Sequence, residues 1–89
     1  MSRLTNAFHN DYTLLCMLRD ELALQTSLFK ADLKDRWRDL EGKLDVLREH
    51  VGRAEAAADH ALPQIEASAR IMLDTLRSGY SDIKRAVTP

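Results

Sequence analysis

The sequence has 89 residues, of which 45% are apolar and 30% are charged. A chain of this length provides one hydrophobic core, so we expect one domain over residues 1–89, and this balance of residues excludes an intrinsically disordered protein. The net charge of −1 comes without a strongly basic segment, which argues against a nucleic-acid partner.

The cysteine content and the apolar runs bear on localisation. The one cysteine, Cys16, cannot form an intramolecular disulfide and fits a reducing compartment. The first residues lack the apolar core of a signal peptide, and the longest apolar run, Leu14 to Leu18, is too short to span a bilayer. We therefore expect a cytoplasmic protein.

Helix-forming residues dominate the chain, which contains only 3 glycines and 2 prolines. Apolar residues recur with the spacing of one helix face over most of the sequence, and no alternating strand pattern occurs. The pattern predicts an all-α protein. Either a helical hairpin or a three-helix bundle with coiled-coil-like packing fits it.

The first predicted helix covers about residues 10–30. Asn10 or Asp11 can cap its first turn, and Asn6 is an alternative cap. Its apolar face is wider than one seam, so we expect it to contact two neighbouring helices. The residues that widen this face are Leu14, Met17, Leu24 and Leu28.

The boundary between the first and second helices stays open at this point. Apolar residues step by four from Phe29 through Leu33 to Trp37, which indicates a turn or a stutter in one continuous helix. Residues 26–32 contain no Gly, Pro or Asn to favour a loop. A continuous helix over residues 11–59 would be about 73 Å long, and a second chain would have to cover it. We therefore favour assembly into a multi-helix dimer.

The second predicted helix covers about residues 32–60. From Leu44 onward its apolar residues alternate in steps of three and four, the spacing of a coiled-coil seam. We interpret this seam, with its continuation in the next helix, as both core and assembly interface. The residues assigned to it are Leu40, Leu44, Leu47, Val51, Ala54, Ala58, Ile65, Met72 and Leu76.

The third predicted helix covers about residues 62–86. Proline costs roughly 3 kcal/mol inside a helix but is tolerated in its first turn, so Pro63 predicts a break just before it. Asp59 or His60 can cap the new helix. Gly79 is an internal weak point rather than a stop, because the apolar spacing continues beyond it.

The histidines do not predict a metal site. On one helix His50 and His60 would lie about 15 Å apart along the axis, too far to share a metal ion. His9 and Cys16 do not match the spacing of known metal motifs.

Carboxylates on the second helix do not predict catalysis. Glu41, Asp45 and Glu49 share one polar face, where we expect them to be solvated with no cause for a raised pKa. The sequence contains neither a phosphate-binding loop nor a nucleophile motif. We expect no enzyme activity, no cofactor and no metal.

An amphipathic helical chain without reactive motifs predicts an interaction protein. We expect it to self-associate, as a homodimer, or to bind another helical protein through an apolar helix face. The alternative is binding to a lipid surface. Such helices are usually basic along the edges of the apolar face, whereas acids and bases are mixed here.

Overall fold

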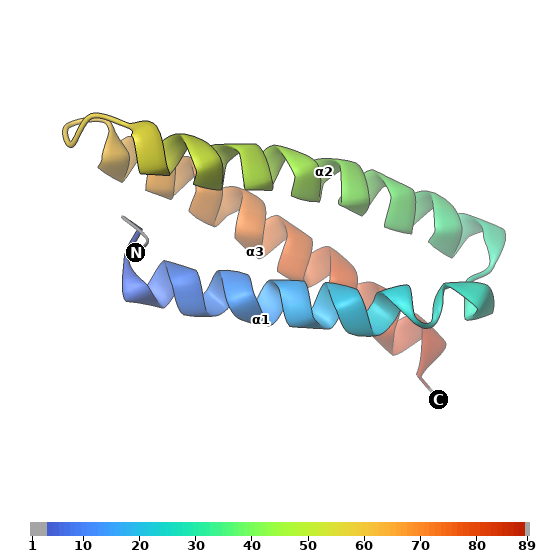
Figure 1. Cartoon of the computed structure of the whole chain (residues 1–89). Helices are drawn as coiled ribbons and strands as arrows, with labels where there is room; N and C mark the ends of the chain where they lie inside the picture. Colours follow the sequence, from blue (N-terminus) through green and yellow to red (C-terminus); the bar gives the residue numbers. More distant parts are fainter. Residues whose placement is uncertain (1–3, 89) are drawn as a thin grey trace.

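The computed structural model describes residues 4–88, which form three α-helices and one short 3₁₀ turn. The helices are α1 (Asn6–Ala23), α2 (Ala31–Ala56) and α3 (Leu62–Val87), and the turn η1 (Thr26–Leu28) joins the first two. Figure 1 shows them as an elongated bundle with α3 running obliquely to the other two. The all-α fold is confirmed, in its three-helix form.

Helix α1 begins at Asn6, so the predicted cap at Asn10 or Asp11 is wrong, and the alternative cap Asn6 is one residue too late because the N-cap is Thr5. The side chain of Thr5 caps the helix by accepting the N–H of Phe8 at 3.2 Å. The N–H of Thr5 itself donates to the carboxylate of Glu66 on α3 at 2.6 Å. The early start carries Phe8 into the core, where it is 1% exposed.

Helix α1 ends at Ala23, not near residue 30, and a continuous helix through residues 26–32 is excluded. The N–H groups of Leu24 and Gln25 donate to carbonyls only three residues back, which tightens the last turn. The chain then becomes extended at Phe29, whose buried side chain anchors the turn. No residue within 4–88 has a positive φ, so this reversal needs no glycine.

Helix α2 ends at Ala56, short of the predicted end at residue 60, because the chain is already extended at Ala57. Helix α3 begins at Leu62 with Pro63 in its first turn, as the cost of an internal proline predicts. The predicted capping by Asp59 or His60 is wrong: the N-cap residue is Ala61, and no side chain caps the helix.

The core lies where α3 meets its two neighbours. Helices α2 and α3 have 26 residues each and pack along each other, while α1 rests mainly on α3. A β-carbon at Gly79 on α3 would lie 2.6 Å from a δ-carbon of Leu40 on α2. The predicted weak point is therefore a place where two helices approach closely.

Candidate functional site

The predicted interface residues lie mostly between α2 and α3 of the same chain. Val51, Ile65 and Met72 are partly buried at the edge of the core, and Ala58 is exposed in the turn between the helices. The buried members of the set are Leu40, Leu44, Leu47, Ala54 and Leu76. One chain thus covers the seam that the sequence assigned to assembly, so that seam is no free interface.

A different apolar surface remains exposed on the outer side of α1 and the turn after it. We call it the α1 stripe. Its exposed fractions run from 61% at Leu14 and Met17 to 87% at Leu24. Its members are Leu14, Met17, Leu24 and Leu28. These residues widen the apolar face of α1, but in this chain they contact no helix that buries them.

A polar and aromatic cluster joins all three helices and is called here the three-helix cluster: Arg19, Trp37, Glu41 and Tyr80. Arg19 on α1 donates from Nε to Oε1 of Glu41 at 2.9 Å and from Nη2 to Oε2 at 2.8 Å. Tyr80 on α3 donates its hydroxyl to the same Oε1 at 2.9 Å. One carboxylate on α2 therefore connects α1 and α3.

Contacts with the Trp37 ring add to the polar contacts of the three-helix cluster. The guanidinium of Arg19 lies 5.6 Å from the ring centre of Trp37. The Trp37 ring in turn lies 5.5 Å from Tyr80 and 5.7 Å from Phe29, centre to centre. Planar groups from α1, the turn and α3 thus surround one indole, which fixes its orientation.

The expectation that Glu41 is a solvated carboxylate is wrong. Burial by itself would raise its pKa, but hydrogen bonds from Arg19 and Tyr80 outweigh that effect and hold the pKa below the ordinary value of 4.5. Burial and the bond to Glu41 raise the pKa of the Tyr80 hydroxyl. Both shifts favour an ionised carboxylate that accepts a hydrogen bond from a protonated phenol.

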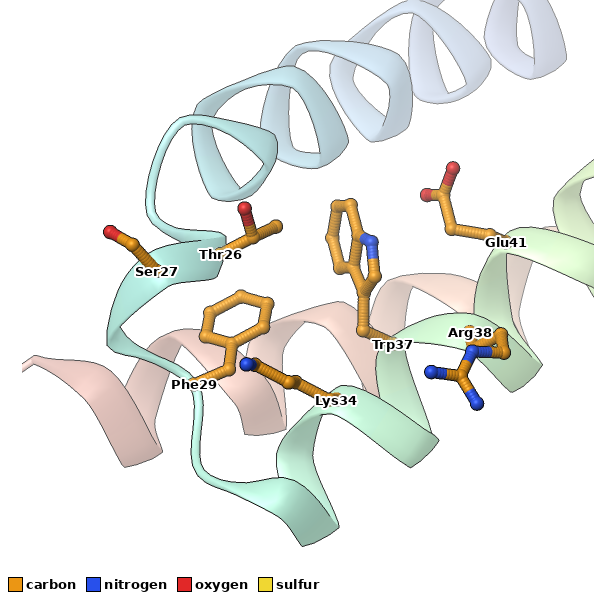
Figure 2. Close-up of a pocket in the computed structure, with 7 residues that line it drawn as sticks. All are labelled: Thr26, Ser27, Phe29, Lys34, Trp37, Arg38 and Glu41. Atoms are coloured by element: carbon orange, nitrogen blue, oxygen red, sulfur yellow. The ribbon is translucent and has the colours of Figure 1, made fainter.

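A shallow depression that could take a ligand lies beside the three-helix cluster. It has a volume of about 560 Å³ and lies between η1 and the first turns of α2. Figure 2 shows Trp37 standing between the turn and Glu41, with Lys34 next to Phe29. We call it the Trp37 pocket; its lining residues are Thr26, Ser27, Phe29, Lys34, Trp37, Arg38 and Glu41.

The remaining candidates from the sequence are not brought together. His9 and His60 are exposed, and Nδ1 of His50 lies 3.0 Å from the carbonyl oxygen of Val46. Cys16 is partly buried. Across residues 4–88, no three acidic, histidine or cysteine side chains are grouped so that they could hold a metal ion.

The described helices are also not of the kind that crosses a membrane: within residues 4–88 none is both long and apolar enough. Comparison with protein-family models, with characterised proteins and with solved structures gives no match to this chain. The fold alone therefore defines the class of protein, which is a small all-α three-helix bundle.

Sequence reasoning missed the three-helix cluster because its members are far apart along the chain. Glu41 lies 22 residues from Arg19 and 39 residues from Tyr80. One signal was present. Tyr80 follows the apolar spacing of α3, and a buried tyrosine hydroxyl needs a hydrogen-bond partner.

Proposed function

We propose that this protein is a non-enzymatic interaction module that associates through the α1 stripe, with a second copy of the chain as its partner. The observation that carries the proposal is the exposure of four large apolar side chains on α1 and in the segment that follows it. Exposed apolar side chains that gather on one surface are characteristic of protein-binding sites, whereas scattered ones are ordinary.

The spacing of Leu14 and Met17 supports a helical partner. Leu14 and Met17 are three residues apart, Leu24 and Leu28 are four apart, and seven residues separate the two pairs. Only Leu14 and Met17 lie within α1, where a step of three places them on one helix face and Glu21 follows four residues later. Leu24 and Leu28 come after the helix ends at Ala23, so a regular seam does not extend to them. Glu21 is held to the side by Lys84 on α3, with 3.5 Å between the carboxylate and the amine.

A second copy is the simplest partner because the stripe is apolar and offers no charge pattern that selects another surface. Two identical stripes related by a two-fold axis are self-complementary, and such dimers are the commonest oligomers. The dimer predicted from the sequence thus stays a proposal, but it rests on a different set of residues. We also propose a cytoplasmic location, because Cys16 is partly buried and forms no disulfide, which fits a reducing compartment.

Charge argues against the lipid alternative. Helix α1 carries acidic residues at Asp11, Asp20 and Glu21, and its basic residue Arg19 is held by Glu41. A helix that binds an anionic membrane surface usually presents lysines and arginines beside its apolar face. Apart from Arg19, helix α1 contains no lysine or arginine.

Sedimentation equilibrium over a concentration series tests the proposal. We expect the wild-type mass to rise toward twice the chain mass, and the double variant Leu14→Gln with Met17→Gln to stay monomeric with an unchanged helical circular dichroism spectrum. Ile71→Gln is the matched control, because Ile71 is 70% exposed but lies on α3.

Two results would overturn the proposal. One is a wild-type protein that stays monomeric at high micromolar concentration. The other is an Ile71→Gln variant that loses association as fully as the stripe variant. Binding of the monomer to anionic vesicles, with a gain in helical signal, would favour the lipid alternative in its place.

A further inference from the structure

The Trp37 pocket adjoins the α1 stripe at the turn η1 but shares no lining residue with it, and it has its own chemistry. Its walls come from the turn η1 on one side and from successive turns of α2 on the other (Figure 2). A volume of about 560 Å³ is within the range of ligand sites, but the depression is open to solvent along its length. That shape suits one or two side chains of a passing segment better than an enclosed cofactor.

The floor of the pocket is aromatic and held in place. Phe29 is 4% exposed, and its ring packs in a T-shaped arrangement with Trp37, 5.7 Å between ring centres. Trp37 is itself fixed between Arg19 and Tyr80. A floor that is already ordered loses little conformational entropy when an apolar group binds to it.

The charges around the pocket leave a net positive rim. The negative charge of Glu41 is compensated by Arg19 at 2.8 Å. Arg38 has only a loose pair with Asp35 at 3.8 Å, and both side chains are largely exposed. Among the described residues, no carboxylate lies within ion-pair distance of the Lys34 amine.

We propose that the Trp37 pocket binds a short peptide segment of a partner protein in which a carboxylate stands next to an apolar side chain. The apolar group packs mainly on the partly exposed Trp37, because Phe29 is almost fully buried. The carboxylate pairs with Lys34, and Arg38 adds to the attraction at the rim. The hydroxyl of Ser27 on the opposite wall can donate a further hydrogen bond, whereas that of Thr26 already donates to the carbonyl of Ala23 at 3.4 Å.

This inference goes beyond the proposed dimer and does not depend on it. The stripe residues Leu14, Met17, Leu24 and Leu28 do not line the pocket, so either surface can fail without the other. A free phosphate is a poorer occupant because it would leave the aromatic floor uncovered. A partner segment with both groups uses the cation and the floor together.

The fluorescence of Trp37 provides a direct test, because the chain has one tryptophan and it lines the pocket. The probe is the N-acetylated dipeptide amide of phenylalanine and aspartate. Its matched control replaces aspartate by asparagine, which keeps the shape and removes the charge. We expect a saturable change in emission, with the asparagine probe binding about threefold more weakly and added salt removing this difference.

Two protein variants locate the charge. Lys34→Gln is expected to bind both probes equally, at the level of the asparagine probe on the wild-type protein. Lys30→Gln is the matched control, since Lys30 is also exposed but does not line the pocket. It is expected to keep the wild-type preference for aspartate.

Several outcomes would overturn the inference. They are the absence of a saturable change up to millimolar probe, equal binding of the two probes to the wild-type protein, and unchanged discrimination in Lys34→Gln. Displacement of the aspartate probe by equimolar inorganic phosphate would show a general anion site instead. Repeating the titration on the Leu14→Gln, Met17→Gln variant separates this inference from the dimer, because binding to the pocket is expected to persist there.

Discussion

Helix α3 makes two unlike contacts, and the difference between them separates what stabilises the bundle from what orients it. Against α2, α3 presents an apolar surface of fully buried side chains and one close approach at Gly79. Against α1, charged groups supplement the apolar contact: Arg70 pairs with Asp11 at 2.7 Å and lies over Phe8. The α2 and α3 hairpin is thus held mainly by hydrophobic burial.

The packing of α1 on α3 relies more on polar interactions, which water weakens. Its pairs, Asp11 with Arg70 and Glu21 with Lys84, are partly exposed, and such pairs contribute about 0.2 to 1 kcal/mol each. Their value is directional, because they fix where α1 lies along α3. The comparison predicts that α1 opens more readily than the hairpin of α2 and α3.

The largest expected effect comes from creating a cavity in the core, once in α2 and once in α1. Leu44→Ala on α2 and Leu15→Ala on α1 remove equally buried side chains, and each is expected to lower the free energy of unfolding by about 2 to 5 kcal/mol in urea denaturation. Amide hydrogen exchange distinguishes them. Leu44→Ala should lower protection in all three helices, and Leu15→Ala mainly in α1.

Equal loss of protection across the three helices in both variants would contradict the comparison. It would mean that α1 is as firmly part of the cooperative unit as the hairpin. Leu14→Ala is the surface control, since Leu14 is 61% exposed, and it should change stability by less than about 0.5 kcal/mol.

The next largest effect concerns the three-helix cluster and its pH dependence. Because the folded protein lowers the pKa of Glu41, the ionised carboxylate contributes stability above the ordinary pKa of 4.5, and that contribution is lost as pH falls through the lower folded value. Glu41→Gln should cost about 1 to 3 kcal/mol at neutral pH, because Arg19 loses its charged acceptor. The variant should lose less stability than the wild type on acidification.

Urea denaturation at neutral and acid pH measures both effects. Glu49→Gln on the same helix is the control, because Glu49 is exposed, and its stability profile should follow that of the wild type. A Glu41→Gln profile parallel to that of the wild type would show that the pair does not link stability to pH.

A smaller effect tests the close approach of α2 and α3. Gly79→Ala forces Leu40 to move, and we expect a net loss of about 1 kcal/mol in spite of the higher helix propensity of alanine. Gly42→Ala is the matched control, because a β-carbon there meets nothing within 4 Å, and it should stabilise by about 0.5 to 1 kcal/mol. Thermal unfolding of the two variants should shift in opposite directions.

If Gly79→Ala stabilises as much as Gly42→Ala, the helices are free to separate slightly and the close approach is not required. The double variant Gly79→Ala with Leu40→Ala adds a check. The two changes should be non-additive, because removing the δ-carbons of Leu40 makes room for the new β-carbon.

The smallest effect belongs to the polar contact of α1. Asp11→Asn removes one charge from a pair in which both side chains are about a third exposed, and we expect a loss of about 0.5 kcal/mol that disappears at high salt. Denaturant titration with and without added salt measures it. A loss that persists in high salt would assign Asp11 a packing role instead of an electrostatic one.

Whether a feature could be predicted from the sequence depends on how far apart along the chain the interacting residues are. The break before Pro63 depends on one residue and its neighbours, so it was predictable. The end of α1 was not, because the reversal at residues 24–30 uses ordinary residues at negative φ and is held by the burial of Phe29. The same limit hid the role of Glu41, whose partners lie on two other helices.

The sequence by itself determined that this chain is helical, where its last helix begins and which residues share an apolar face, because propensity, proline geometry and periodicity are local properties. Only the tertiary structure decided what covers that face. The turn at residues 57–61 lets α3 cover the seam of α2 from within the same chain, and the α1 stripe is the surface that stays exposed. Which surface stays free depends on how helices far apart in sequence pack, and periodicity contains no information on that pairing.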